Sequence, residues 1–150
     1  MSTSFDTYLV VEDEPSDAFL IQRAFAKANV PNPVRIARDG EEAIEYLGGT
    51  GPYGDRAKFP LPKIMLLDLK LPRRSGLEVL AWVRSQPRLK RLKVVVLTSS
   101  RESRDVNGAA DLGVSSHLVK PVDHARLVEL VTALDALLLR CSEHPDLVDD

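Results

Sequence analysis

The sequence predicts an α/β protein in which a doubly wound, five-stranded parallel sheet carries helices on both faces. Short runs rich in Val, Ile and Leu alternate five times with longer stretches whose apolar residues recur at helical spacing. Three of the short runs are apolar at every position, which is typical of strands buried on both faces of a parallel sheet. The alternation and the continuous apolar runs together indicate the fold class.

The strands are expected, in chain order, at Tyr8–Val11, Val34–Ala37, Ile64–Leu67, Val94–Leu97 and His117–Val119. Helical spacing predicts helices at Ser16–Ala28, Gly40–Leu47, Gly76–Ser85, Ser103–Leu112 and from Asp123 onward. The apolar face expected of the first helix consists of Phe19, Leu20, Ala24 and Phe25. Asp39 is the expected N-cap of the second helix, and Gly113 stands where a glycine commonly ends a helix.

Two segments stand outside this alternation. Gly48–Pro62 is rich in Gly and Pro and predicts a loop or lid that is longer than most such connections. The segment 141–150 contains four acidic residues and neither Lys nor Arg, and we expect it to be frayed. The chain of 150 residues is therefore expected to form a single domain (1–150) with a core from about residue 7 to residue 140.

The composition excludes several classes of protein. A hydrophobic fraction of 44% and a formal net charge of -2 fit a globular protein without an overall charge that would attract nucleic acid. No apolar run approaches the roughly 20 residues of a membrane helix, and the N-terminus lacks the pattern of a secretory signal. The single cysteine, Cys141, precludes an internal disulfide. We expect a cytoplasmic protein that binds neither nucleic acid nor membrane.

Polar residues gather where the predicted strands end. Glu12 and Asp13 follow the first strand, Asp68 follows the third, and Thr98 and Lys120 follow the fourth and fifth. In open α/β sheets, ligands bind beyond the carboxyl ends of the strands. Three converging carboxylates repel one another unless a cation lies among them, and hard oxygen ligands with room for water and phosphate suit Mg²⁺. A carboxylate can also accept a phosphoryl group, whose oxygens a Lys ammonium and a Thr hydroxyl can hold.

The motifs around these residues resemble the receiver domains of two-component response regulators. They are VVEDE at Val10–Glu14, LLDLKLPRRSG at Leu66–Gly76, VVVLTSS at Val94–Ser100 and HLVKP at His117–Pro121. The resemblance runs from the first strand to the last helix, and it implies the flavodoxin-like fold of the bacterial chemotaxis receiver. It also implies a signalling protein that accepts a phosphoryl group from a histidine kinase and catalyses only its own phosphorylation and dephosphorylation.

The resemblance implies a role for each site residue. The phosphoacceptor is Asp68, the switch hydroxyl is Thr98, the family's lysine is Lys120, and the magnesium ligands are Glu12, Asp13, Asp68 and the backbone carbonyl of Lys70.

Three features depart from the family pattern. His117 stands at the aromatic switch position, and Ser75 stands where an acid is common. Lys70 and Ser100 occupy the two positions that are expected to tune the loss of the phosphoryl group. We expect Lys70 to pair with Glu12 or Asp13, or to reach the phosphate.

Other segments resemble a narrower group. SDAFLIQRAF, the Gly/Pro-rich insertion and SSRESRDV are similar to stand-alone regulators paired with phytochrome-type histidine kinases. This likeness implies a bacteriophytochrome as partner, an output delivered by protein–protein binding without an output domain, and a homodimer through the face of the fourth helix, fifth strand and fifth helix. The last helix also carries a wide apolar stripe, formed by Leu127, Val128, Leu130, Val131, Leu134, Leu137, Leu138 and Leu139. A monomer whose stripe is covered by the fourth helix and by Gly48–Pro62 is the alternative.

Three other functions fit the sequence less well than a receiver does. Phosphatases with an aspartyl nucleophile usually carry a second Asp two residues on, where this chain has Lys70. A nucleotide- or flavin-binding module requires a glycine-rich turn after the first strand, where this chain reads EDEPSD. A DNA-binding regulator would draw on the basic ribbon Arg84, Arg88, Lys90, Arg91 and Lys93. No helix-turn-helix follows that ribbon, and a solvated face is expected there instead.

Overall fold

The computed structural model describes residues 7–100 and 102–143, with side chains up to residue 137. Five parallel strands form one sheet in the order β2-β1-β3-β4-β5. The strands are β1 (Thr7–Val11), β2 (Val34–Ala37), β3 (Pro62–Leu67), β4 (Lys93–Thr98) and β5 (Ser116–Val119). The helices are α1 (Pro15–Lys27), α2 (Gly40–Gly48), α3 (Gly76–Ser85), α4 (Ser103–Asp111) and α5 (His124–Glu143), with short 3-10 turns η1 (Gly51–Tyr53) and η2 (Pro87–Leu89). The predicted fold class is confirmed.

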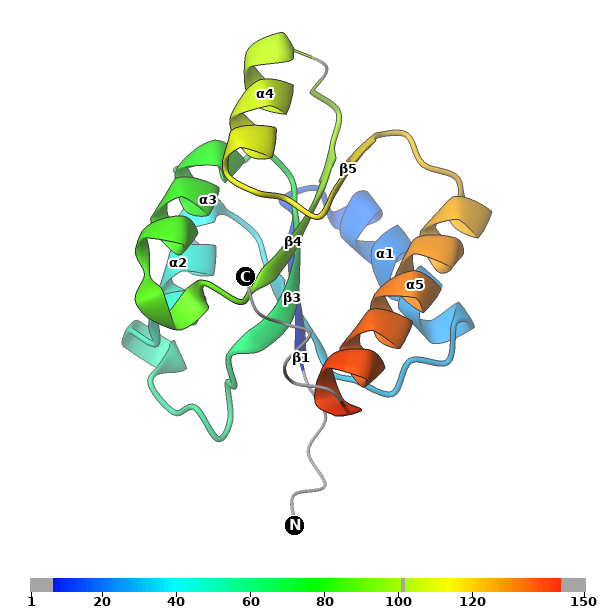
Figure 1. The fold of residues 1–150 in the computed structure, drawn as a ribbon, viewed down its shortest axis with the longest axis horizontal. Helices are drawn as coiled ribbons and strands as arrows, with labels where there is room; N and C mark the ends of the chain where they lie inside the picture. The colour runs from blue at the N-terminus through cyan, green and yellow to red at the C-terminus, as the bar shows by residue number, and fades with distance from the viewer. Residues whose placement is uncertain (1–6, 101, 144–150) are drawn as a thin grey trace.

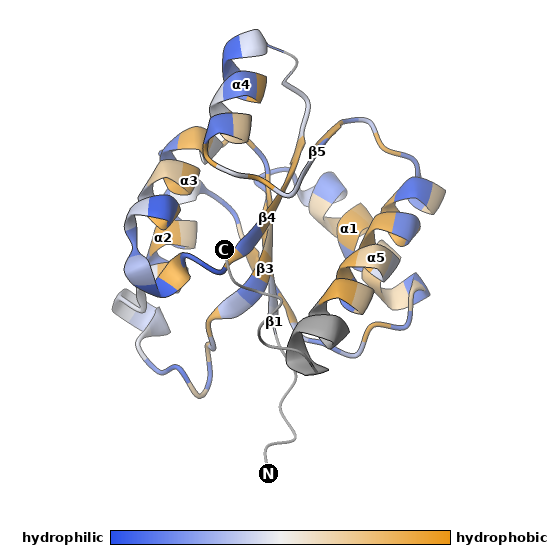
Figure 2. Ribbon diagram, in the orientation of Figure 1, coloured by the Kyte–Doolittle hydropathy of each residue, from blue (hydrophilic) through white to orange (hydrophobic). Residues whose placement is uncertain are grey.

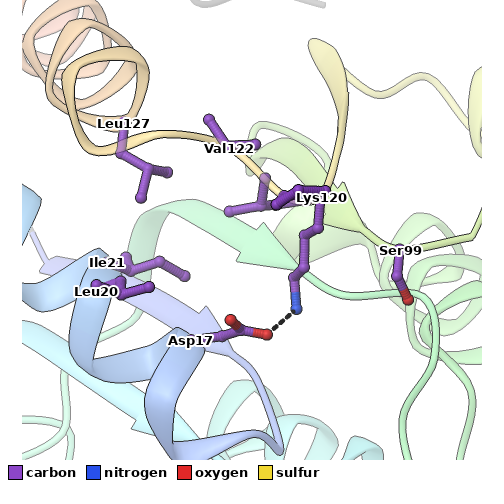
Figure 3. Close-up of a pocket in the computed structure, with 9 residues that line it drawn as sticks. Asp17, Leu20, Ile21, Ser99, Lys120, Val122 and Leu127 are labelled. Carbon is purple, nitrogen blue, oxygen red and sulfur yellow. Dashed lines mark hydrogen bonds and ion pairs between the residues drawn. The ribbon is translucent and has the colours of Figure 1, made fainter.

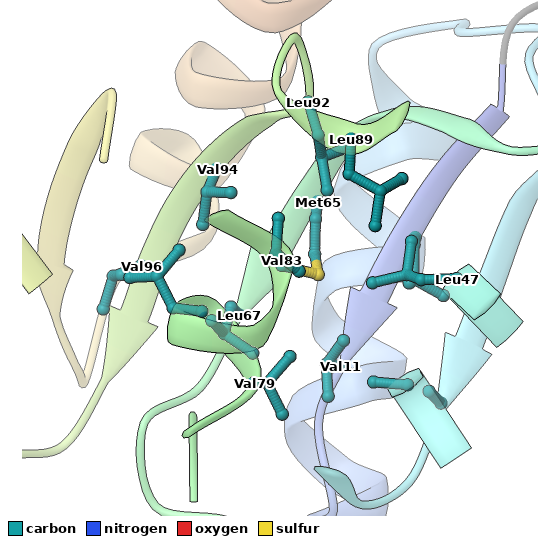
Figure 4. Packing of buried hydrophobic residues seen from close by; sticks show 14 of the residues in the cluster. Val11, Leu47, Met65, Leu67, Val79, Val83, Leu89, Leu92, Val94 and Val96 are labelled. Carbon is teal, nitrogen blue, oxygen red and sulfur yellow. The ribbon is translucent and has the colours of Figure 1, made fainter. Parts of the chain in front are cut away.

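The sheet separates two hydrophobic cores. Figure 1 shows α2, α3 and α4 on one side of the sheet and α1 and α5 on the other. Successive side chains of a strand point to opposite faces, so Leu9 and Val11 enter the first core, whereas Tyr8 and Val10 enter the second. Burying each such aliphatic side chain contributes about 1.5–3 kcal/mol. The apolar residues of the helices face the sheet (Figure 2), and Figure 4 shows how α3 packs on β3 and β4 in the first core.

Local signals fix the helix ends. Asp39 caps α2, since its side chain accepts a hydrogen bond of 2.8 Å from the Glu42 amide. Ser75 is the N-cap of α3: its hydroxyl accepts from the Glu78 amide, and the Glu78 side chain accepts from the Ser75 amide. This capping role accounts for the serine that stands where an acid is common. Gly113 follows α4 with a φ of 77°, as predicted from the sequence.

The predicted apolar face of α1 is wrong for two of its four residues. Phe19 and Leu20 are 58% and 38% exposed, and the buried residues are Ala18, Ile21, Ala24 and Phe25. The Phe25 ring packs edge-on against Tyr8 of β1, with ring centroids 4.7 Å apart. At about 100° per residue, that contact turns Phe19 and Leu20 away from the sheet.

The apolar stripe of α5 is also covered more fully than predicted. Leu127, Val131 and Leu134 are buried in the second core, and Val128 and Leu130 are partly buried against it. Helix α1 lies beside α5 on the same face of the sheet (Figure 1) and provides this cover. Among the side chains described up to residue 137, the stripe is therefore no wider than the fold can bury. Leu138 and Leu139 lie outside the described side chains.

The connection Gly48–Pro62 packs onto α2 and is not a lid over the carboxyl ends of the strands. Arg56 donates hydrogen bonds to the carbonyls of Tyr46, Leu47 and Phe59 at 2.7, 2.8 and 3.1 Å. The rings of Tyr46, Tyr53 and Phe59 pack together with centroids 5.1–6.1 Å apart. Because the connection leads into the start of β3, it lies at the amino end of the strands.

One residue of the predicted basic ribbon has a structural role. The Arg84 guanidinium donates to the carbonyls of Leu112, Gly113 and Leu92 at 2.7, 2.9 and 3.2 Å. These bonds satisfy carbonyls at the end of α4 and tie α3 to it. Among the described residues, no helix combines the length and the apolar character needed to cross a bilayer.

Candidate functional site

The site lies at the carboxyl ends of the three central strands and β5. Backbone hydrogen bonds extend the sheet into the following loops: the amide of Asp68 donates to the carbonyl of Val11 at 3.1 Å, and that of Lys120 donates to Thr98 at 2.8 Å. The loop after β3 is thereby held beside β1, and the loop after β5 is held beside β4. The sequence prediction that these loops converge is confirmed.

Gly76 allows α3 to approach the loop after β3. A Cβ atom at this position would lie 2.3 Å from the Asp68 carbonyl oxygen and 2.5 Å from the Leu69 Cα. The Gly76 amide instead donates to the Leu69 carbonyl at 3.0 Å. A glycine is therefore required for the backbone that presents Asp68.

Three carboxylates meet at this point. Glu12, Asp13 and Asp68 each offer an oxygen that lies within 4.8 Å of the others. Glu12 and Asp68 are only 2% and 5% exposed, whereas Asp13 is exposed. The Lys70 amide donates to Asp68 Oδ1 at 3.0 Å, so the main chain of Lys70 lies beside the cluster. Such a set of hard oxygen donors fits a divalent cation.

Lys120 binds two of these carboxylates and a third acid that the sequence did not reveal. Its ammonium lies 2.7 Å from Glu12 Oε1, 3.2 Å from Asp68 Oδ2 and 2.8 Å from Asp17 Oδ2. Asp17 belongs to the first turn of α1, whereas Asp13 precedes the helix. The place of Asp17 in the acidic segment EDEPSD, Glu12–Asp17, is the signal in the sequence that could have indicated it.

The charges of these groups depend on one another. Burial raises the pKa of Glu12 to about 7, and the neighbouring Asp68 adds to this effect, while the hydrogen bond from Lys120 opposes it. Burial by itself would lower the pKa of Lys120, but the hydrogen bonds to Asp17 and Glu12 outweigh it and raise that pKa. Lys120 is therefore a cation at neutral pH.

A second polar network connects the loop after β3 to α4. The Lys70 ammonium lies 2.9 Å from Glu102 Oε1 and 3.5 Å from Asp105 Oδ2, so the expected pairing of Lys70 with Glu12 or Asp13 is wrong. Ser100 donates from its hydroxyl to Asp105. This hydrogen bond, followed by the charge of Lys70, lowers the pKa of Asp105. The start of α4 lies beside Lys70 in space, which no pattern in the sequence indicates.

The two predicted switch residues lie on neighbouring strands. Thr98 is fully buried, and its hydroxyl accepts a hydrogen bond of 3.2 Å from the Ser100 amide. His117 lies on β5 in register with Val96 of β4 and is half-buried. Within the described part of the chain, its buried Nε2 has no hydrogen-bond partner. The role of His117 in switching stays a prediction.

Two cavities flank the carboxylates. One, of about 630 Å³, is lined by Asp13, Lys70 and Arg104 among others. The second, of about 320 Å³, lies between α1 and the start of α5 and is lined by Asp17, Leu20 and Lys120 among others. Figure 3 shows the Asp17 carboxylate and the Lys120 ammonium facing each other at this second cavity. The site is thus open to small molecules and to a docked side chain.

The geometry agrees with a known family. Residues 8–132 match the sequence model of the response regulator receiver domain. The chain belongs to this family. It is 36% identical over 131 residues to the response regulator Rcp1 of Synechocystis sp., covering 87% of each chain. It is also 36% identical over 137 residues to FilR2 of Methanothrix harundinacea, a probable methanogenesis regulatory protein, covering 91% of this chain and 86% of FilR2.

Solved receiver structures are similar over nearly the whole chain. The phosphorylated cyanobacterial phytochrome response regulator RcpA aligns with a TM-score of 0.79 at 38% identity, covering 91% of this receiver and 95% of RcpA. The Mn²⁺-bound form of Rcp1 aligns with a TM-score of 0.78 at 35% identity, covering 90% and 95%. The chain is therefore a response regulator receiver, and its acidic cluster is of the kind that binds a divalent cation.

Proposed function

We propose that this receiver takes a phosphoryl group from a histidine kinase onto Asp68. The carrying observation is the position of Asp68, a member of the acidic cluster that is only 5% exposed and lies 3.2 Å from the Lys120 ammonium. Asp68 accepts hydrogen bonds from Lys70 N and Lys120 Nζ, and of the two aspartates in the cluster it is the buried one. RcpA, which is similar over most of its length, is known in a phosphorylated form.

The chemistry follows from the charges. A carboxylate oxygen of Asp68 would attack phosphorus, forming a P–O bond while the P–N bond of a phosphohistidine breaks and the imidazole leaves with the electron pair. Lys120 would hold a phosphoryl oxygen, and Thr98 would donate its hydroxyl to another. The same residues would serve when water later hydrolyses the acyl phosphate, so the protein would catalyse its own phosphorylation and dephosphorylation only.

We propose Mg²⁺ as the cation of this site. Asp13, Asp68 and the Lys70 carbonyl would be direct ligands, and Glu12 would bind partly through water. The bound cation would neutralise the charge of the phosphoryl oxygens. The three converging carboxylates support this assignment, because Mg²⁺ commonly binds through one or two carboxylates together with phosphate oxygens.

The partners are inferred from the relatives. RcpA is described as a phytochrome response regulator, which supports a phytochrome-type histidine kinase as the donor. FilR2, at the same identity as Rcp1, is named a probable methanogenesis regulatory protein, so the relatives of this chain are not confined to light signalling. We further propose that residues 1–150 act as one receiver domain whose output is protein binding, with a homodimer through α4, β5 and α5.

Phosphorylation by a small donor tests the central assignment. Incubation with acetyl phosphate and Mg²⁺ should add one phosphoryl group, measured by the mass of the intact protein, and alkali should remove it. Asp68→Asn should abolish this gain. Asp111→Asn, which removes an exposed carboxylate at the end of α4, is the matched control and should be labelled like the wild type. Full labelling of the Asp68→Asn protein would overturn the assignment.

A further inference from the structure

Asp17 contacts the same Lys120 ammonium as the proposed phosphoacceptor, Asp68. The Lys120 ammonium has three N–H donors, and in this structure it makes three contacts, with Glu12, Asp17 and Asp68. The contact with Asp17, at 2.8 Å, is shorter than the contact with Asp68, at 3.2 Å. Every donor of the ammonium is therefore occupied before any phosphoryl group is present.

A phosphoryl group on Asp68 would need one of these donors. Glu12 and Asp68 would share their oxygens with a bound cation, but Asp17 is not among the residues of the acidic cluster. The Asp17 side chain is 35% exposed and lies on α1. Its ion pair with Lys120 would therefore remain when a cation binds the acidic cluster. Because the carboxylates of Asp17 and Asp68 both contact this ammonium, a phosphoryl group on Asp68 would lie close to the Asp17 charge, and like charges repel.

We propose that Asp17 is a positioning residue that holds Lys120 in the unphosphorylated state and competes with the phosphoryl group for its ammonium. This inference rests on the proposed function of Asp68. It predicts that Asp17 weakens binding of a phosphoryl group, although its hydrogen bond with Lys120 stabilises the resting site. The cavity beside Asp17 gives the freed carboxylate a solvent-facing space when Lys120 turns away (Figure 3).

Beryllofluoride mimics a phosphoryl group on an aspartate carboxylate and binds reversibly, with no phosphodonor. Its affinity therefore measures, at equilibrium, how readily the resting site accepts a phosphoryl group. With Mg²⁺ present, its affinity can be measured by NMR titration of the wild type and of variants. Asp17→Asn should bind beryllofluoride about three- to tenfold more tightly, the range expected for loss of one partly exposed, charge-assisted hydrogen bond. Asp17→Glu, which retains the carboxylate, should return the affinity to within about twofold of the wild type.

Glu14→Gln is the matched control. Glu14 is exposed at the start of α1, and its side chain accepts from Ser16 rather than from Lys120. Glu14→Gln removes one negative charge near the site without touching Lys120. It should change the affinity for beryllofluoride by less than about twofold. Spectra without beryllofluoride establish that each variant is folded.

Two results would overturn the role of Asp17. One is an Asp17→Asn protein that binds beryllofluoride no more tightly than Glu14→Gln; the other is an Asp17→Glu protein that binds as tightly as Asp17→Asn. Failure of the proposed function gives a different result, because the wild type would then not bind beryllofluoride, or Asp68→Asn would bind it equally well.

Discussion

Lys120 is the residue on which the electrostatic balance of the resting site depends. It is 15% exposed and faces Glu12 and Asp68, which are almost fully buried. A buried carboxylate without a cation is costly, because desolvation is no longer offset by a nearby opposite charge. The amount of stability that Lys120 provides should therefore depend on whether another cation is present.

Lys120→Met keeps most of the side-chain stem and removes the charge. Without divalent cations, near neutral pH, we expect it to lower the free energy of unfolding by about 2–4 kcal/mol. Saturating Mg²⁺ should restore part of this loss, since the cation would compensate the same carboxylates. Urea unfolding followed through the single tryptophan, Trp82, measures both quantities.

Lys63→Met is the control for this prediction. Lys63 is exposed on β3, so its substitution should change stability by no more than about 0.5 kcal/mol. Equal losses in the two variants, or a loss in Lys120→Met that Mg²⁺ leaves unchanged, would contradict the proposed balance.

The sequence predicted which residues end the strands but not where their neighbours' side chains point. Glu12, Asp68 and Lys120 could be placed because parallel strands bring their carboxyl ends to one edge. The positions of Asp17 and Asp105 could not be predicted, because each lies on a helix whose orientation against the sheet decides where the side chain points. The position of Lys70 beside Glu102 has the same cause: the distance between the loop after β3 and α4 is set by tertiary packing.

At the scale of elements, the connection between α2 and β3 is a packed structure with its own hydrogen bonds. The Tyr53 hydroxyl donates to Glu42 Oε2 at 2.7 Å, and its ring contacts Tyr46 and Phe59. The hydrogen bond to the Glu42 carboxylate, followed by burial, raises the pKa of Tyr53 to about 12. Composition suggested a loose loop, because Gly and Pro are visible in the sequence and aromatic packing is not.

Tyr53→Phe tests this connection. Near neutral pH it should lower the free energy of unfolding by about 1 kcal/mol, the usual contribution of one such hydrogen bond. Because the folded-state pKa lies above the ordinary value of 10.0, the stabilisation is complete below pH 10 and is lost as the pH rises toward about 12. Urea unfolding at increasing pH should therefore show the gap between wild type and Tyr53→Phe narrowing only above pH 10. A gap that already closes below that pH would contradict the assignment.

The two errors on helix faces have a common origin. Hydropathy placed Phe19 and Leu20 inward because both are large and apolar, and it indicated more apolar surface on α5 than one side of the sheet can cover. In the structure, α1 is oriented so that Phe25 packs against Tyr8, and the same helix covers α5. Apolar periodicity predicts that a helix has a buried face, but contacts with a neighbouring helix decide which residues form it.

At the scale of the whole molecule, the fold class and the order of elements followed from the sequence alone. All ten predicted strands and helices are present, with ends that differ by at most two residues. Buried parallel strands and capped helices leave strong local patterns, which explains this success. Assembly leaves no such pattern, because a surface that binds a second copy resembles one that packs within the chain.

The proposed homodimer can be tested with exposed apolar residues of two helices. Val106 of α4 is 36% exposed on the proposed dimer face, and Phe19 is 58% exposed on α1, which is not part of that face. By sedimentation at micromolar concentration, the wild type should exceed the monomer mass of 16.6 kDa. Val106→Lys should shift it toward the monomer, whereas Phe19→Lys should not. A single monomeric species, with and without a phosphodonor, would rule out the dimer.

Chemical trapping of the acyl phosphate tests the central claim most directly. Borohydride reduces an aspartyl phosphate to homoserine, so peptide mass spectrometry after incubation with acetyl phosphate and Mg²⁺ reports which aspartate was modified. Asp68 is the carboxylate that Lys120 and the Lys70 amide both hold in place, and we predict homoserine at position 68. Homoserine at Asp13 or Asp17 instead of position 68, or phosphorylation without any homoserine, would contradict the account.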